Sequence, residues 1–169
     1  MAKYVALLRA VNVGGTGKLP MTELKSMCEH AGFSAVRTFI ASGNVVFDSG
    51  QTASQVAVAL ESRLAIYAGK PVGVLVRTGA EMAAVLADNP FVDEAPNRVV
   101  AIFLEAAPPA DALHHVTGNK AERMALGKRE IYVHYGDGMA DSRLKIAAAK
   151  TGTARNMNTV ARLAAMAME

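Results

Sequence analysis

Residues 36–47, Val-Arg-Thr-Phe-Ile-Ala-Ser-Gly-Asn-Val-Val-Phe, carry the pattern that decides the fold. Two runs rich in β-branched and aromatic residues, Val36–Ile40 and Val45–Phe47, predict a pair of strands. Between them, Gly43-Asn44 supplies the positive φ that a tight turn demands. This stretch is therefore predicted to be a β-hairpin.

The segments on either side of this hairpin extend the pattern to βαββαβ. A short apolar run precedes it, and Pro20 suits the first position of a helix because its φ is fixed. Apolar residues at helical spacing then alternate with capping and stop signals. The predicted elements are a strand at Tyr4–Arg9, a helix from Pro20 to Gly32, a helix capped by Ser54 and stopped by Gly69, and a strand at Pro71–Arg77.

Two signals mark the middle of the chain. Thr78-Gly-Ala-Glu81 is a capping-box pattern and predicts a short helix. The following Asp88–Asn97 contains two prolines and two asparagines, which is typical of a linker. We therefore expect an N-terminal half at residues 1–95 and a C-terminal half at residues 96–169.

The second half repeats the order of elements. Its second hairpin has Gly127-Lys128 at the turn, in the place that corresponds to Gly43-Asn44. The predicted elements are strands at Val99–Leu104, Glu122–Leu126, Ile131–Tyr135 and Thr151–Ala154, a short helix through Leu113 and Val116, a helix from Asp141 or Ser142 through Leu144 and Ile146, and a last helix at Asn156–Met168.

Two successive βαββαβ units predict an α+β fold of two tandem ferredoxin-like halves, each an alpha-beta plait, with an extra C-terminal helix. Strands Tyr4–Leu8 and Val99–Leu104 are apolar on both faces, so both are expected to be covered. Covered sheets fit poorly with an open RNA-recognition platform, which would also need exposed strand aromatics.

Composition narrows the class of protein. The 169 residues are 51% hydrophobic and 20% charged, with a net charge of +3, which is globular. No apolar run approaches the roughly 20 residues of a membrane span, so no membrane association is expected. Cys28 is the single cysteine, which fits a reducing compartment and predicts a cytoplasmic protein. The four histidines lack metal-ligand spacing, so neither a metal nor a cofactor is predicted.

A glycine-rich segment at Asn12–Lys18 lies between a strand and a helix, where a phosphate-binding loop would stand. It lacks the first glycine of the Walker pattern, and Leu19 replaces the hydroxyl residue that would bind Mg²⁺. An NTPase is therefore not predicted. Backbone N–H groups and Lys18 could still hold an anion, although a plain flexible loop explains the same residues.

Charge is unevenly distributed along the chain. Residues 1–95 carry eight basic and eight acidic residues, whereas residues 142–168 carry five basic residues and no acid. Within this basic stretch, Arg155-Asn156 precedes the last helix, whose N-terminus favours anions. The alternative is that these charges simply solvate alanine-rich helices.

Several blocks together resemble one family, the uncharacterised bacterial family catalogued as domain of unknown function 1697. They are Val5–Gly15, Lys18–Met21, Ser42–Phe47, Thr153–Asn156 and Asn158–Val160, and the resemblance runs from about residue 3 to 165. It implies two ferredoxin-like halves and leaves the activity unassigned. Many members have tryptophan where this chain has Met157, so a stacking role there is in doubt.

The best functional hypothesis is a non-enzymatic binder of an anionic ligand, either phosphate-bearing or nucleic acid. The chain offers no recognisable catalytic constellation. Two alternatives stay open: a small-molecule enzyme with a cleft between the halves, and a homo-oligomeric module, most simply a homodimer. The candidate ligand-binding residues are Arg9, Asn12, Gly14, Gly15, Lys18, Ser42, Asn44, Arg155 and Asn156.

Overall fold

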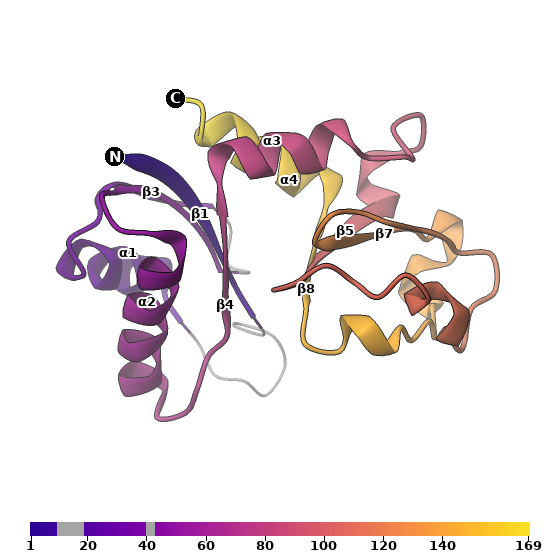
Figure 1. Ribbon diagram of the computed structural model, residues 1–169, viewed down its shortest axis with the longest axis horizontal. Helices are drawn as coiled ribbons and strands as arrows, with labels where there is room; N and C mark the ends of the chain where they lie inside the picture. Colours follow the sequence, from indigo (N-terminus) through magenta and orange to yellow (C-terminus); the bar gives the residue numbers. More distant parts are fainter. Residues whose placement is uncertain (10–18, 40–42) are drawn as a thin grey trace. The chain divides into compact units, whose positions relative to one another are not determined.

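The computed structural model describes residues 1–9, 19–39 and 43–169, apart from the side chains of residues 138 and 140. Contacts divide the chain into two compact units (Figure 1). Unit 1 comprises Met1–Met82 with Leu163–Glu169, and unit 2 comprises Ala83–Arg162. The boundary expected between residues 95 and 96 stays a prediction.

Unit 1 is built on a four-stranded antiparallel sheet in the order β2-β3-β1-β4. Strands β1 and β3 lie at the centre of the sheet, and both are formed by strongly apolar segments of the sequence. Its elements are β1 (Ala2–Leu8), α1 (Met21–His30), β2 (Ser34–Thr38), β3 (Asn44–Ser49), α2 (Ala53–Ala68) and β4 (Val74–Thr78).

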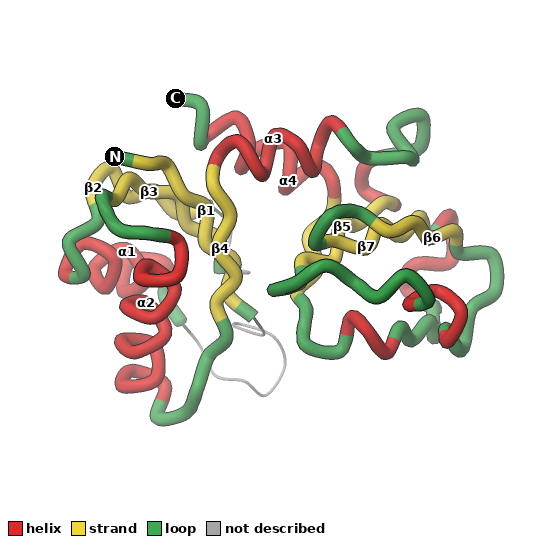
Figure 2. The backbone as a smooth tube through the Cα atoms, in the orientation of Figure 1, coloured by secondary structure: helices red, strands yellow, loops and turns green. Residues whose placement is uncertain are grey.

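Helices α1 and α2 cover one face of this sheet (Figure 2). Side chains alternate along a strand, so Tyr4, Ala6 and Leu8 share the covered face of β1. They join one apolar cluster with Leu24 of α1 and Leu60 of α2, both fully buried. Stacking of Phe33 on Phe47, with ring centroids 4.3 Å apart, closes the cluster near β3.

The helix ends differ in detail from the prediction. Pro20 is the N-cap of α1 rather than its first helical residue. Helix α2 is capped by Thr52 instead of Ser54, because Thr52 and Gln55 form a reciprocal capping box that satisfies two free N–H groups. Gly69 ends α2 as expected, with a left-handed φ of 71°.

Two further helices are α3 (Gly79–Ala87) and α4 (Met157–Met166). The capping box before α3 is confirmed: the amide of Glu81 donates to Thr78 Oγ1, and the amide of Thr78 donates to Glu81 Oε1. At the other end of the chain, the Arg37 guanidinium donates to the carbonyl of Met166 and pairs with the carboxylate of Glu169. Arg37 thereby satisfies a carbonyl of the last turn of α4 within unit 1.

Unit 2 has a second four-stranded antiparallel sheet, in the order β6-β7-β5-β8. Short 3₁₀ segments, labelled η, join its strands. The elements are η1 (Pro96–Arg98), β5 (Val99–Phe103), η2 (Ala112–His115), β6 (Arg123–Leu126), β7 (Glu130–His134), η3 (Gly136–Asp141), η4 (Ala147–Ala149) and β8 (Thr153–Asn156).

The two helices predicted between the strands of unit 2 are wrong. A single 3₁₀ turn, η2, stands where the helix through Leu113 and Val116 was expected. At the second site, Lys145 is extended and forms a backbone bridge with Thr117. Pro108 and Pro109 disfavour a longer helix in the first connection. In the second, the Ser142 hydroxyl accepts a hydrogen bond from the Leu144 amide, which stabilises a turn.

The chain is therefore a mixed α+β protein with two four-stranded antiparallel sheets. Both predicted hairpins are present, as β2–β3 and β6–β7, and Gly43 has the expected positive φ of 88°. Among the described residues, no helix is both long and apolar enough to cross a membrane.

Candidate functional site

A pocket of about 560 Å³ lies within unit 2, against the sheet face that carries Ile102. Unit 1 covers its equivalent layer with helices of ten and sixteen residues, but unit 2 uses 3₁₀ turns of three and four residues. Segment η4 consists of three alanines, Ala147–Ala149, which have little side-chain volume. The thin cover leaves space that a helix with larger side chains would fill.

The lining combines apolar and basic residues. Strand β5, the η2 end, Tyr135 and one continuous stretch of the chain all contribute. The lining residues are Ile102, His115, Thr117, Tyr135, Leu144, Lys145, Ile146, Ala147, Ala149 and Lys150.

Residues 142–150, which we call the strap, supply most of this lining. The strap is fastened by two backbone hydrogen bonds, from Thr117 N to Lys145 O at 3.0 Å and from Lys145 N to Thr117 O at 2.8 Å. Beside them, Gly118 has a φ of +70° and lies so close to the strap that a Cβ there would be 2.0 Å from the Arg143 carbonyl oxygen. Only glycine fits that approach.

A side-chain hydrogen bond fastens the start of the strap. The Ser142 hydroxyl donates to Glu122 Oε2 at 2.7 Å, while Glu122 Oε1 accepts from the Lys120 amide at 2.8 Å. The Lys120 amide first, and the Ser142 hydroxyl next, lower the pKa of the Glu122 carboxyl. Burial, with a smaller contribution from Glu122, raises the pKa of Tyr135, so its phenol is a neutral hydrogen-bond donor at the pocket wall.

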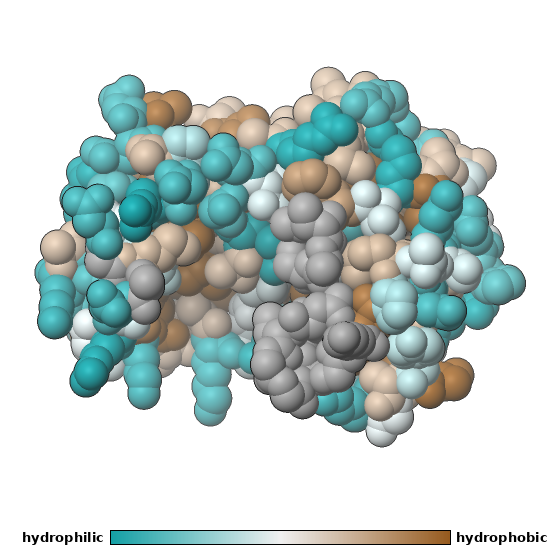
Figure 3. Space-filling model, turned by 180° about the vertical axis from the view of Figure 1, so that it is seen from behind, coloured by the Kyte–Doolittle hydropathy of each residue, from teal (hydrophilic) through white to brown (hydrophobic). Residues whose placement is uncertain are grey.

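The ionic groups of the lining are all basic. Lys145 and Lys150 line the pocket, and no carboxylate stands among the lining residues that the structure describes. His115 Nε2 lies 3.3 Å from Asp111 Oδ2, one turn away and exposed. Figure 3 shows hydrophobic atoms recessed between projecting hydrophilic side chains on the surface of unit 2. This arrangement suits an anion with an apolar body.

Five of the nine predicted site residues, Asn12, Gly14, Gly15, Lys18 and Ser42, lie outside the described residues. Two others, Arg9 and Asn44, lie at one end of the first sheet, where the Leu8 amide donates to the Gly43 carbonyl at 2.8 Å. Asn44 is fully buried and its Nδ2 donates to the Phe39 carbonyl at 2.9 Å, which holds the hairpin together. The side chain of Arg9 is exposed.

The remaining two predicted residues end strand β8. Arg155 is buried and donates to Thr153 Oγ1 at 2.8 Å and to the Ala154 carbonyl at 2.9 Å. Burial lowers the pKa of its guanidinium to about 10, which still leaves it charged at neutral pH. Asn156 Oδ1 accepts from the Thr159 amide at 3.0 Å, so Asn156 is the N-cap of α4.

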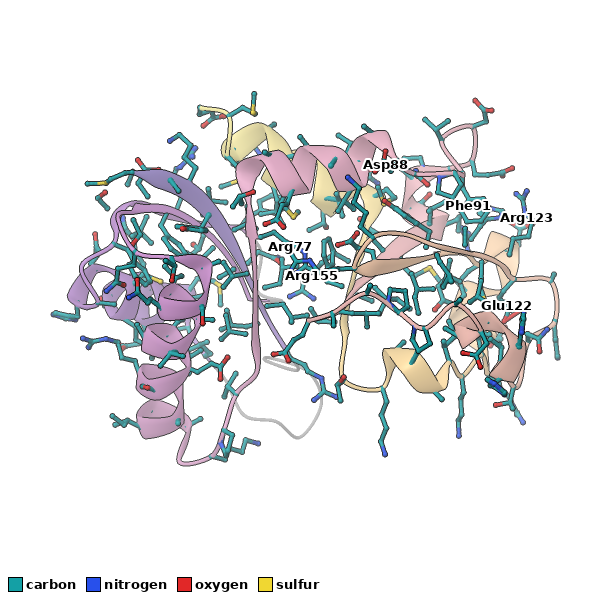
Figure 4. The ribbon with its side chains drawn as sticks, viewed as in Figure 1. Arg77, Asp88, Phe91, Glu122, Arg123 and Arg155 are labelled. Carbon is teal, nitrogen blue, oxygen red and sulfur yellow. The ribbon has the colours of Figure 1, made fainter. Side chains whose placement is uncertain are left out.

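The sequence reasoning missed a cluster at the edge of the second sheet (Figure 4). The guanidinium of Arg123 lies 5.2 Å from the centre of the Phe91 ring and donates to Glu94 Oε1 at 2.8 Å. His134 contributes Nε2, 3.3 Å from Glu94 Oε2, and its ring lies 5.9 Å from that of Phe91. Phe91 and Glu94 belong to the expected linker, which is therefore fastened to β6 and β7.

The pocket was missed too, although part of its signal was visible. Lys145 and Lys150 belong to the acid-free stretch 142–168. The sequence pattern predicted a helix in this stretch, and a helix there would have covered the sheet face. No pocket was therefore expected.

Comparison with known proteins identifies the family. The model of the protein family of unknown function DUF1697 matches residues 1–132. The chain belongs to this family. A solved structure, the conserved bacterial protein SP0830 from Streptococcus pneumoniae, is similar over 98% of each chain, with a TM-score of 0.82 and 22% identity. This likeness shows the fold alone. No curated protein matches the sequence.

Proposed function

We propose that this DUF1697 protein is a non-enzymatic binder of a small anionic molecule, and that the molecule binds in the pocket of unit 2. The charge of the lining carries this proposal. Lys145 and Lys150 stand at an otherwise largely apolar pocket that has no carboxylate among its described lining residues. A cleft that is lined by charges of one sign and has apolar walls focuses their field and attracts ions of the opposite sign.

Hydrogen-bond donors support the same conclusion. The side chains of Thr117, Tyr135 and Lys145 have no hydrogen-bond or ion-pair partner among the described residues. Ligand pockets commonly combine an apolar lining with a few polar groups of this kind, at volumes of roughly 300–1,000 Å³. The pocket of about 560 Å³ falls in that range.

The site that the sequence predicted at the glycine-rich loop, with Arg9, Lys18 and Arg155, stays a separate prediction. Lys145 and Lys150 support the other part of that hypothesis, which attributed anion binding to the basic C-terminal stretch. No observation favours the enzyme or the homodimer over ligand binding. In the apolar segment at the end of the last helix, Ala164, Met166 and Ala167 are buried, whereas Met168 is 73% exposed.

The proposal extends to the plan of the fold. Both sheets have the same order, with the second and third strands paired as a hairpin and the first strand between the third and the fourth. This supports a plan of two tandem ferredoxin-like halves, in which 3₁₀ turns stand in place of the helices in the second half and border the pocket. The single cysteine, Cys28, fits a reducing compartment and so supports a cytoplasmic location. Burial and then Glu29 raise its pKa to about 12, so its thiol is unreactive.

Binding of small anions by the purified protein tests the function. Orthophosphate, acetate, butanoate and citrate would each be titrated by calorimetry and by thermal denaturation, since a ligand of the native state raises its stability. We expect at least one anion to bind and Lys145→Gln to weaken it about tenfold. The matched control is Lys128→Gln, which removes a lysine on the β6–β7 turn outside the pocket. Equal affinities for the two variants, or no binding of any anion, would refute the proposal.

A further inference from the structure

The polarity of the pocket changes from floor to mouth. Ile102 and Ile146, which form its floor, are each 8% exposed, and Leu144 and Ala149 are half-buried. Lys145, Lys150 and His115 are exposed. The apolar lining is thus deep and the cationic lining is shallow.

This gradient excludes a compact polar anion as the best ligand. A phosphate ion held by the shallow lysines would leave the deep apolar lining facing water, and water in such a space lacks polar partners. An anion placed deep in the pocket would lose its hydration without a cation beside it. A molecule with an apolar part and a charged end fits both, because its apolar part covers the deep lining and its charged end lies beside the shallow lysines.

The shape of the charged end follows from the donors near the mouth. Lysine side chains keep the ammonium group hydrated while their methylene stems cover apolar surface. A carboxylate beside them stays partly hydrated and accepts hydrogen bonds from an ammonium or from the hydroxyl of Thr117 or Tyr135. An ammonium group such as that of Lys145 matches a carboxylate without a fixed bidentate geometry.

We infer that the ligand of this pocket is an acyl carboxylate, with its hydrocarbon chain on Ile102 and Ile146 and its carboxylate at Lys145 and Lys150. The inference rests on the proposed function and specifies the ligand class for that site. Each further CH₂ of the ligand that is buried in the pocket contributes about 0.8 kcal/mol to binding, which corresponds to about fourfold in affinity. Affinity therefore rises with chain length until the pocket is full.

A chain-length series on the unmodified protein is the main test. Acetate, butanoate, hexanoate and octanoate would be titrated by calorimetry well below micelle-forming concentrations. We expect about fourfold tighter binding for each CH₂ and a negative heat-capacity change that grows along the series. A flat series, with acetate or phosphate binding as well as octanoate, would overturn the acyl ligand while leaving anion binding intact. Absence of binding by every anion would overturn the proposed function as well.

Reversing the head group separates the two parts of the ligand. Octylamine, protonated at neutral pH, and neutral octanol carry the same chain without the negative charge. We expect both to bind at least tenfold more weakly than octanoate, and the difference to shrink in Lys145→Gln but not in Lys128→Gln. Equal binding of all three would show that the chain alone is recognised, which contradicts the carboxylate at the lysines.

Filling the pocket tests the position of the chain. Ala149→Phe places a large side chain on the η4 wall, and Ala147→Leu is the smaller change at the same wall. We expect the gain in affinity per CH₂ to vanish in either variant while acetate binding stays the same, with circular dichroism verifying the fold. Retention of the fourfold increment in a folded variant would place the chain elsewhere and refute the assignment.

Discussion

The hydroxyl of Ser142 donates a hydrogen bond of 2.7 Å to Oε2 of Glu122, twenty residues earlier in the chain. This bond ties the beginning of the strap to the loop before β6. The next attachment along the strap is the backbone pair between Thr117 and Lys145. A short strap with so few attachments is expected to open locally more often than the sheet beneath it.

Removing the Ser142 hydroxyl should loosen the strap. In Ser142→Ala the Lys145 and Thr117 amides should exchange with deuterium a few-fold faster, because the neighbouring attachment is lost. Amides of β5 and β7 should be unaffected. Hydrogen exchange followed by NMR measures both sets in one sample, and an equal increase in all of them would indicate global destabilisation instead.

The same bond makes the strap sensitive to acid. Hydrogen bonds from the Lys120 amide and then the Ser142 hydroxyl lower the pKa of Glu122, so the native state favours its ionised form. This stabilisation is complete above the ordinary carboxyl pKa of about 4.3 and disappears as the pH falls through the lowered native value. Urea denaturation at pH 7 should therefore distinguish wild type from Glu122→Gln, and at pH 3 the two midpoints should converge. A constant difference across this range would contradict the role of the ionised carboxylate.

Gly118 permits the close approach of the strap, and alanine should not be tolerated there. Its Cβ would meet the Arg143 carbonyl at 2.0 Å in addition to the positive φ. We expect Gly118→Ala to lower the free energy of unfolding by about 3 kcal/mol. Gly136→Ala is the matched control, since Gly136 has a φ of +62° and open space around its Cα. It should cost only about 1 kcal/mol, the strain of the left-handed backbone. Equal losses by urea denaturation would mean that the close approach does not matter.

Phe91 should hold residues 88–95 against the second sheet. Phe91→Ala removes the ring beneath the Arg123 guanidinium and should lower the free energy of unfolding by about 1 kcal/mol. Cleavage between residues 88 and 95 should become faster in limited proteolysis. Val92→Ala changes the next residue, which is 73% exposed, and should leave both measurements unchanged.

Sequence patterns were sufficient for the strands because each strand has a local signature. The runs that became β1, β5 and β7 are short and apolar, and Gly43 identifies a turn by itself. Helix boundaries differ from the predicted ones by a few residues where two nearby side chains could each cap the helix. Thr52, for example, caps α2 in place of Ser54.

The candidate pocket could not be predicted in the same way, because it results from a helix that does not form. Leu144 and Ile146 have a spacing that suits either a helix or an extended strap, and the bridge from Lys145 to Thr117 decides between them. That bridge joins residues that are 28 positions apart in the chain, so no local sequence pattern predicts it. Asn44 and Asn156 were singled out as ligand-binding candidates, and the hydrogen bonds of their side chains hold the first hairpin together and cap α4.

The contact of Arg37 with Met166 and Glu169 has a consequence for biosynthesis. A ribosome releases residues 1–82 long before it makes residues 163–169, and all of unit 2 is translated in between. The Arg37 guanidinium therefore stays hydrated, without these two partners, until residues 163–169 have been made. Unit 1 is thus completed only after unit 2 has been made, whereas unit 2 is a continuous segment that can fold as it emerges.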